Sequence, residues 1–329
     1  MLLLAACLPL LQACGGAAPG RWSVDLPWRT VIAVAGQPDN ETGPLGLAAG
    51  DATLVVADSF ADRLLIWRAS NAGWQGPTGV TLPTRHAILQ VAVGPAANAP
   101  VYAATASGGI WEVGAGAAPR RLARFAAGTG DLRRVVGMVV GERGLWVEVV
   151  SVRADATTRE LAAVGVSGAR LLRRAVLASA AESAGSPPAW LYSPAGVRVS
   201  LGAGPQGSYW LVGRNPRGGP ALLRLGADGA PEARRPWPEG LAGADFLGVA
   251  PSGLGYVLVN AGTDRQHLEA LTARAAVRRT RAFPAGAGPR LPHPAAMAPD
   301  GAVAVLTAAP GALRIDWYPA NAIWVVSSR

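Results

Sequence analysis

A short apolar run, bounded by Gly, Asp and Asn, recurs along this chain. The run begins at six positions: Leu54, Val101, Leu145, Tyr209, Tyr256 and Val303. The successive spacings are 47, 44, 64, 47 and 47 residues. Such a recurrence indicates one structural unit built several times over, so the spacing limits the fold more than any other feature of the sequence.

A spacing in the forties predicts an all-β chain folded as a single β-propeller, whose repeat is a sheet of four short strands. Three apolar segments fill most of each unit, and a weaker Arg-containing stretch follows, as in residues 121–125 and 277–283. We expect six four-stranded blades, with seven as the alternative count. Residues 28–35 and 323–326 both have strand-like patterns, and either segment can close the ring by pairing the N- and C-terminal strands.

The first unit has the most distinctive letters. It reads PLGLAA over residues 44–49, DATLVVAD over 51–58 and DRLLIW over 62–67. This order, an apolar strand, a Gly/Asp turn, a strand ending in V-A-D and a strand opening on D-R, resembles one unit of the NHL-repeat and YncE-like propellers. The resemblance covers this one unit, and the other units keep the spacing with different letters.

The N-terminus has the features of a leader. Residues 1–11, MLLLAACLPLL, are too few to span a membrane and have the length of a signal-peptide core. They lead into the segment LQACG, which ends on Cys14 and Gly15 and resembles the lipobox of bacterial lipoproteins. The resemblance implies cleavage before Cys14, lipidation of Cys14, and an exported chain that is lipid-anchored to the bacterial membrane and faces the periplasm or the cell surface.

The expected domain organisation follows from these two features. A signal peptide spans residues 1–13, the lipidated Cys14 and a flexible tether span 14–27, and the propeller spans 28–329. The 64-residue spacing marks an insertion within residues 166–195. Its Ala-, Leu- and Glu-rich part, residues 175–184, predicts a short helix. The insertion is either neutral loop growth or part of a working face.

All 30 basic residues are Arg, and the formal net charge is +9. The absence of Lys excludes a phosphate-loop lysine, a Schiff base and a lysine general base. The Arg residues are scattered through stretches expected to form outer strands, so they predict a solvated rim and no nucleic-acid partner. The two cysteines, Cys7 and Cys14, lie in the leader and at the lipidation position, so no disulfide is expected.

Motifs of known catalytic sites are missing from the sequence, which contains neither H-E-x-x-H nor G-x-S-x-G. His86, His267 and His293 are far apart in the sequence, and we predict neither a catalytic residue nor a metal ligand among them. Residues 202–207 match G-x-G-x-x-G, but the strand-like letters SYWLV follow, where a dinucleotide site needs a helix. This motif therefore predicts a hairpin turn.

The loops between the second and third strands of each unit open on one face of a propeller, together with the connections between blades. In this chain these loops contain side chains of both charges, which suit a polypeptide or a polar ligand. The candidate binding residues are Asp58, Asp62, Arg63, Arg153, Asp155, Arg214, Asn215, Arg217, Asn260, Asp264 and Arg265. Their alternative role is local, since Asp, Asn and their neighbours often satisfy the backbone groups of their own turns.

Two functions remain open. The first is a monomeric, non-catalytic scaffold of the cell envelope that binds an envelope protein, an extracellular polypeptide or another ligand and needs no cofactor. The second is an enzyme similar to the six-bladed calcium-dependent lactonases and esterases or to the quinone-dependent dehydrogenases. A calcium site needs several Asp, Glu or Asn side chains at the channel axis. The sequence offers few acids at the expected inner strand ends, so it favours the scaffold.

Overall fold

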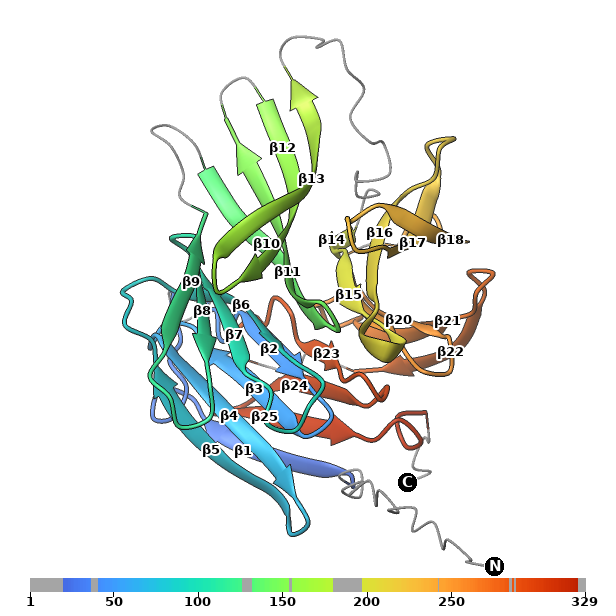
Figure 1. The fold of residues 1–329 in the computed structure, drawn as a ribbon. Helices are drawn as coiled ribbons and strands as arrows, with labels where there is room; N and C mark the ends of the chain where they lie inside the picture. The colour runs from blue at the N-terminus through green and yellow to red at the C-terminus, as the bar shows by residue number, and fades with distance from the viewer. Residues whose placement is uncertain are drawn as a thin grey trace, which may run out of the picture.

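Strands make up almost all of the secondary structure (Figure 1). The computed structural model describes residues 20–36, 41–125, 132–153, 156–179, 197–241, 243–283, 286 and 288–324. The described residues contain a short 3₁₀ helix, η3 (Pro205–Gly207). They contain no helix that is long and apolar enough to cross a membrane.

Three four-stranded antiparallel sheets follow one another in chain order. The first contains β2 (Gly46–Ala49), β3 (Thr53–Asp58), β4 (Arg63–Ser70) and β5 (Gly73–Thr81). The second contains β6 (Ile88–Val93), β7 (Val101–Thr105), β8 (Gly109–Val113) and β9 (Arg120–Arg124). The third contains β10 (Leu132–Gly141), β11 (Gly144–Val152), β12 (Ala156–Gly165) and β13 (Gly168–Ser179).

The next sheet has nine strands and is built from two antiparallel runs of four. One run is β15 (Leu201–Ala203), β16 (Tyr209–Arg214), β17 (Pro220–Leu225) and β18 (Pro231–Pro236). The other is β19 (Ala244–Val249), β20 (Gly255–Val259), β21 (His267–Leu271) and β22 (Val277–Ala282). The runs are joined because β15 pairs in parallel with β19, and β14 (Val197–Val199) also pairs with β19. The antiparallel β15–β16 pairing confirms the hairpin predicted at residues 202–207.

The last sheet joins the two ends of the chain, in the order β1 (Trp22–Pro27), β25 (Ala312–Tyr318), β24 (Val303–Ala309) and β23 (Ala295–Met297). The first strands of successive sheets contact one another from β2 through β6, β10, β15 and β19 to β23, and β23 returns to β2. The sheets therefore stand around a central axis (Figure 1). The predicted β-propeller is confirmed, and the number of blades stays a prediction.

Closure of the ring involves a different N-terminal segment from the one predicted. Strand β1 pairs with β25 from Trp22 opposite Trp317 to Pro27 opposite Ala312. Residues 28–35 form only isolated bridges and turns. Of the predicted segment 323–326, residues 323–324 form a turn and residues 325–326 lie outside the described residues. The predicted tether over 14–27 therefore includes a strand of the propeller. The physical reason is the alternation in β1, where Trp22, Val24 and Leu26 pack against the core while the intervening side chains are exposed.

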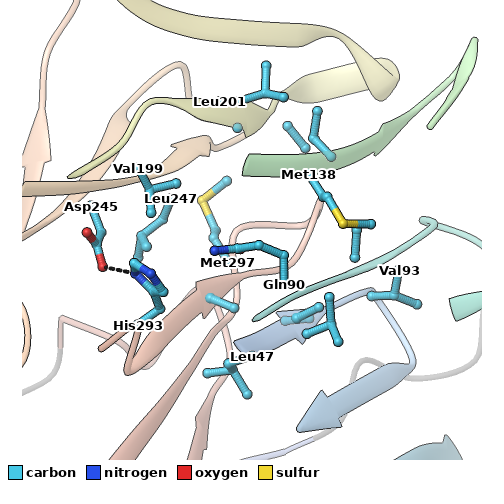
Figure 2. A pocket seen from close by; sticks show the side chains of 18 of the residues that line it. Leu47, Gln90, Val93, Met138, Val199, Leu201, Asp245, Leu247, His293 and Met297 are labelled. Atoms are coloured by element: carbon cyan, nitrogen blue, oxygen red, sulfur yellow. Dashed lines mark hydrogen bonds and ion pairs between the residues drawn. The ribbon is translucent and has the colours of Figure 1, made fainter. Parts of the chain in front are cut away.

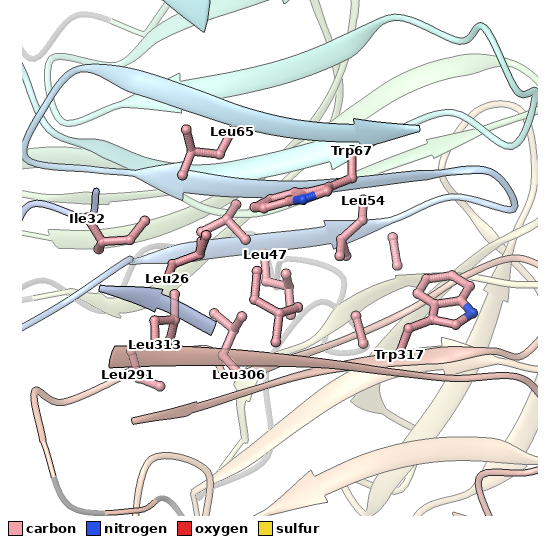
Figure 3. Close-up of a cluster of buried hydrophobic side chains, with 14 of the residues drawn as sticks. Leu26, Ile32, Leu47, Leu54, Leu65, Trp67, Leu291, Leu306, Leu313 and Trp317 are labelled. Carbon is pink, nitrogen blue, oxygen red and sulfur yellow. The ribbon is translucent and has the colours of Figure 1, made fainter. Parts of the chain in front are cut away.

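The core lies between adjacent sheets. Leu54, Trp67, Leu306 and Trp317 belong to one cluster between the first and the last sheet (Figure 3). The aromatic side chains continue this packing, because Trp146 of β11 stacks on Tyr209 of β16 with ring centroids 3.9 Å apart. The hydroxyl of Tyr209 donates a hydrogen bond to the carbonyl oxygen of Gly144 at 2.7 Å, and burial raises the pKa of Tyr209 to about 12.

The third sheet is longer than its neighbours. Its strands contain 9 to 12 residues, and Figure 1 shows their ends projecting beyond the other sheets. The helix predicted over residues 175–184 is wrong for residues 175–179, which belong to β13, and residues 180–184 lie outside the described part. Pairing along β12, where Ala156 stands opposite Ser179, outweighs the local helix propensity of this segment.

A buried ion pair connects the third sheet to the next one. Glu148 of β11 and Arg159 of β12 form a salt bridge, with side chains 2% and 5% exposed. Ser200, between β14 and β15, donates from Oγ to Oε2 of Glu148 at 2.7 Å and accepts a hydrogen bond from Arg159. The carboxylate thus has partners on both of its oxygens, as a buried charge requires.

Candidate functional site

The inner strands enclose a central channel of about 110 Å³ (Figure 2). Its wall is mainly apolar, and Leu47, Met138, Leu201 and Met297 come from four different sheets. Gln90 of β6 adds one amide to this wall. The inner strands β2, β6, β10, β15, β19 and β23 each supply several lining residues, so their mainly apolar side chains determine the character of the channel.

A polar cluster lies at one end of the channel, where Asp245 of β19 and His293 line the wall (Figure 2). Nδ1 of His293 lies 3.0 Å from Oδ2 of Asp245. Arg198 of β14 donates to both carboxylate oxygens, from Nε to Oδ1 at 3.0 Å and from Nη2 to Oδ2 at 3.1 Å. The side chain of Asp245 is 3% exposed, so these contacts neutralise a charge that is almost fully buried.

Arg198 also connects separate parts of the ring. It donates from Nη1 to the carbonyl oxygen of Ala261 at 2.9 Å and from Nη2 to that of Pro292. The guanidinium therefore fixes the β20–β21 connection and the segment before β23 relative to Asp245. Nε2 of His293 forms no hydrogen bond with any described residue, and its imidazole is partly exposed. The carboxylate thus positions an imidazole that has one nitrogen available at the channel.

The cluster supplies two groups that can bind a metal, the carboxylate of Asp245 and the imidazole of His293. Within the described residues, no group of three or more His, Cys, Asp and Glu side chains is arranged to hold a metal ion. The sequence does not predict this cluster, because His293 lies between two prolines, far in sequence from Asp245, the acidic residue that pairs with it. The available signal was Asp245, an acid inside the apolar strand ADFLGV.

The predicted residues of the first unit serve the fold. Asp58 is completely buried, and its Oδ2 accepts hydrogen bonds from Nη2 of Arg63 at 2.5 Å and from Nε at 3.2 Å. Oδ1 of Asp58 accepts from the backbone N–H of Ala33, and Arg63 donates to the carbonyl oxygen of Val31. Asp62 has φ of 51° and shapes the turn between β3 and β4. The pair holds the segment after β1 against the first sheet.

Arg153, Asn215, Arg217, Asn260, Asp264 and Arg265 lie in connections between second and third strands, and Arg214 is the last residue of β16. Oδ1 of Asn215 accepts from the backbone N–H groups of Arg217 and Gly219, and Arg214 donates to the carbonyl oxygen of Gly218. Asn260 has φ of 53° at the start of its turn. Four of these residues are exposed, namely Arg153, Arg217, Asp264 and Arg265. Asp155 and Cys14 lie outside the described residues.

We use the term loop face for the side of the ring formed by the β3–β4, β11–β12, β16–β17 and β20–β21 connections. The projecting end of the third sheet stands on this face. Leu132 begins β10 and Val152 ends β11, directly opposite each other in register. Their exposed fractions are 56% and 42%, which makes them unusual among the large apolar side chains of the described residues. This exposed pair was not predicted from the sequence.

Comparisons with known proteins support the architecture. No family model matches the chain, and no curated protein matches it in sequence. A solved luciferin-regenerating enzyme is 10% identical, with 90% of this chain and 95% of that chain covered and a TM-score of 0.51. A gluconolactonase from Xanthomonas campestris is 13% identical over 88% and 97%, with a TM-score of 0.47. A protein from Lactobacillus plantarum is 16% identical over 87% and 89%, also with a TM-score of 0.47. At 10% identity the likeness to the luciferin-regenerating enzyme, whose TM-score exceeds 0.5, shows the fold alone.

Proposed function

We propose that the chain is an exported, lipid-anchored β-propeller that binds a protein partner in the cell envelope and catalyses no reaction. The observation that carries this proposal is the exposed pair Leu132 and Val152 on the projecting end of the third sheet. Exposed apolar side chains that adjoin one another and are rimmed by charge are typical of protein-binding surfaces. Arg134 and Arg153, both exposed, supply such a rim.

The channel supports a binding role over a catalytic one. Most of the side chains that line it are apolar, and both oxygens of Asp245 are already engaged by Arg198 and His293. The lipobox-like segment ending at Cys14 supplies the anchor in this proposal, and acyl chains added there would hold the ring at the membrane surface. A rigid ring with one projecting sheet then presents its apolar end to a neighbouring envelope protein.

The first test is a crosslinked pull-down of the full chain from its native membrane, with partners identified by mass spectrometry. The Cys14→Ala variant is expected to lose the partner, because it is no longer held at the membrane. The doubly substituted Leu132→Ser/Val152→Ser chain is expected to bind the identified partner about a hundredfold more weakly, since each apolar side chain contributes roughly 1.5 kcal/mol or more when buried.

The matched control is Val166→Ser/Val277→Ser, which removes two side chains that are 76% and 50% exposed elsewhere on the ring. The control chain is expected to bind as the unsubstituted chain does. Equal weakening by both double substitutions, or capture of no stoichiometric envelope protein, would contradict the proposal.

The pair of Asp245 and His293 favours a second candidate, a hydrolase acting on a small ester or lactone in the channel. A carboxylate that positions an imidazole is the usual arrangement of a general base. Under this candidate the full chain hydrolyses such a substrate, and His293→Gln lowers kcat by about 10²- to 10⁴-fold.

The control is His267→Gln, because His267 forms a similar pair with Glu269, 3.1 Å away on β21. Loss of turnover on chelation would indicate calcium, and absence of turnover from the unsubstituted chain would exclude this candidate.

A further inference from the structure

A second cavity, of about 550 Å³, lies between the β5–β6 connection and the second sheet, and it shares no lining residue with the central channel. Its lining includes Arg85, His86, Arg121, Arg124 and Trp111. No Asp or Glu is among the described residues that line it. The cavity therefore combines three permanent positive charges with an imidazole and an indole.

A β-bulge places two of these arginines on the same face of their sheet. In the β8–β9 pairing, Arg124 stands opposite Gly109 and Arg121 stands opposite Trp111, and the register shifts between Ile110 and Trp111. Residues three apart on a regular strand point to opposite faces. The bulge adds one residue to β9 between the two arginines, so both side chains point to the same face. Bulges are known to redirect side chains in this way.

The neighbouring arginine on β9 gives a contrast. Arg120 stands opposite Glu112 and forms an ion pair with it. By comparison, Arg85, Arg121 and Arg124 form no ion pair and no side-chain hydrogen bond with any described residue. Unpaired guanidinium groups gathered around one cavity repel one another, and an anion bound between them would relieve that repulsion.

The wall of the cavity is held in place by the fold. The backbone N–H of Leu82 donates to the carbonyl oxygen of Asp62 at 2.8 Å, and Oγ1 of Thr84 accepts from the N–H of His86 at 3.2 Å. Gly109 keeps the floor open, because a Cβ there would lie 3.1 Å from Nε1 of Trp111. This Nε1–H has no hydrogen-bond partner among the described residues and is a further donor for a ligand.

We propose that this cavity binds a phosphate group carried by a ligand whose organic part packs on Trp111. A carboxylate offers one negative charge, whereas a phosphate offers up to two charges and several oxygens to planar guanidinium donors. The same chemistry can come from a soluble sugar phosphate or from a phospholipid headgroup. Binding should weaken as the salt concentration rises, since the guanidinium groups are exposed.

Calorimetric titration of the full chain with sodium pyrophosphate and with glucose 1-phosphate tests the soluble source. Flotation of the Cys14→Ala chain with vesicles of phosphatidylglycerol and phosphatidylcholine, against vesicles of phosphatidylcholine alone, tests the lipid source. The Arg121→Gln/Arg124→Gln chain is expected to bind about tenfold or more weakly to whichever phosphate source, soluble or lipid, the unsubstituted cavity binds. The control Arg234→Gln/Arg278→Gln removes the same charge from two other outer strands, β18 and β22.

The control chain is expected to bind like the unsubstituted chain. Equal weakening by both double substitutions would mean that the affinity depends only on the net charge of the chain, and this result would overturn the proposal. Absence of binding to glucose 1-phosphate, to pyrophosphate and to the phosphatidylglycerol vesicles would overturn it as well. Neither result bears on the protein-binding surface at Leu132 and Val152, which is tested with other variants.

Discussion

Replacing Glu148 by alanine is expected to lower the free energy of unfolding by about 3–5 kcal/mol. The substitution removes the carboxylate that pairs with the buried guanidinium of Arg159, and it removes the acceptor for Oγ of Ser200. Removing one partner of a buried ion pair costs far more than the pair itself contributes. Urea denaturation followed by tryptophan fluorescence measures the change, because Trp146 lies two residues away on β11.

Glu112→Ala provides the matched control. Glu112 also forms an ion pair with an arginine on the neighbouring strand, but its partner Arg120 is 51% exposed. Exposed ion pairs contribute about 0–1 kcal/mol, so the control is expected to change stability little. A loss below about 1 kcal/mol for Glu148→Ala would show that water reaches Arg159, and would contradict the buried network.

Deleting β1, Trp22–Pro27, from the full chain is expected to destabilise the ring by at least the cost of losing one large core side chain, about 3–5 kcal/mol. The deletion removes the side chain of Leu26 from the core and the ring of Trp22 from its contacts with Trp67 and Trp74. It also exposes the edge of β25, and unpaired edges associate with other chains. Denaturation measures the loss of stability, and size-exclusion chromatography measures the association.

The control for this deletion is removal of residues 15–20, which has the same length and ends before β1. This shortened chain is expected to keep both its stability and its elution volume. If the two deletions behaved alike, β1 would not be part of the closed ring, and the boundary predicted at residue 28 would be restored.

The repeat could be predicted from the sequence because the second strand of each unit is almost completely buried. Leu54, Tyr209 and Val303 lie within or begin β3, β16 and β24, and each must be apolar to fill the space between sheets. The edge strand β1 escaped prediction because only one of its two faces is covered. The end of strand β13 was not predicted because its Ala- and Leu-rich sequence has a high helix propensity, which the pairing with β12 outweighs.

The candidate sites were less predictable for a different reason. Asp245 and His293 are 48 residues apart, and only the ring places them in contact. Arg121 and Arg124 share a face through a bulge, and alternation along the strand would have separated them. By contrast, the local roles of Asn215 and Asp62 could be predicted, because the turns that they shape involve only residues adjacent in the sequence.

The antiparallel pairing of β1 with β25 determines how the ring responds to mechanical force. Trp22 and Trp317 stand at the same end of the two strands, so tension between the start of β1 and the end of β25 opens the hydrogen bonds one pair at a time. Tension between the start of β1 and the start of β25 pulls the two strands along their own axes and loads all six residue pairs together. The β1–β25 pairing therefore resists the second kind of pulling better than the first.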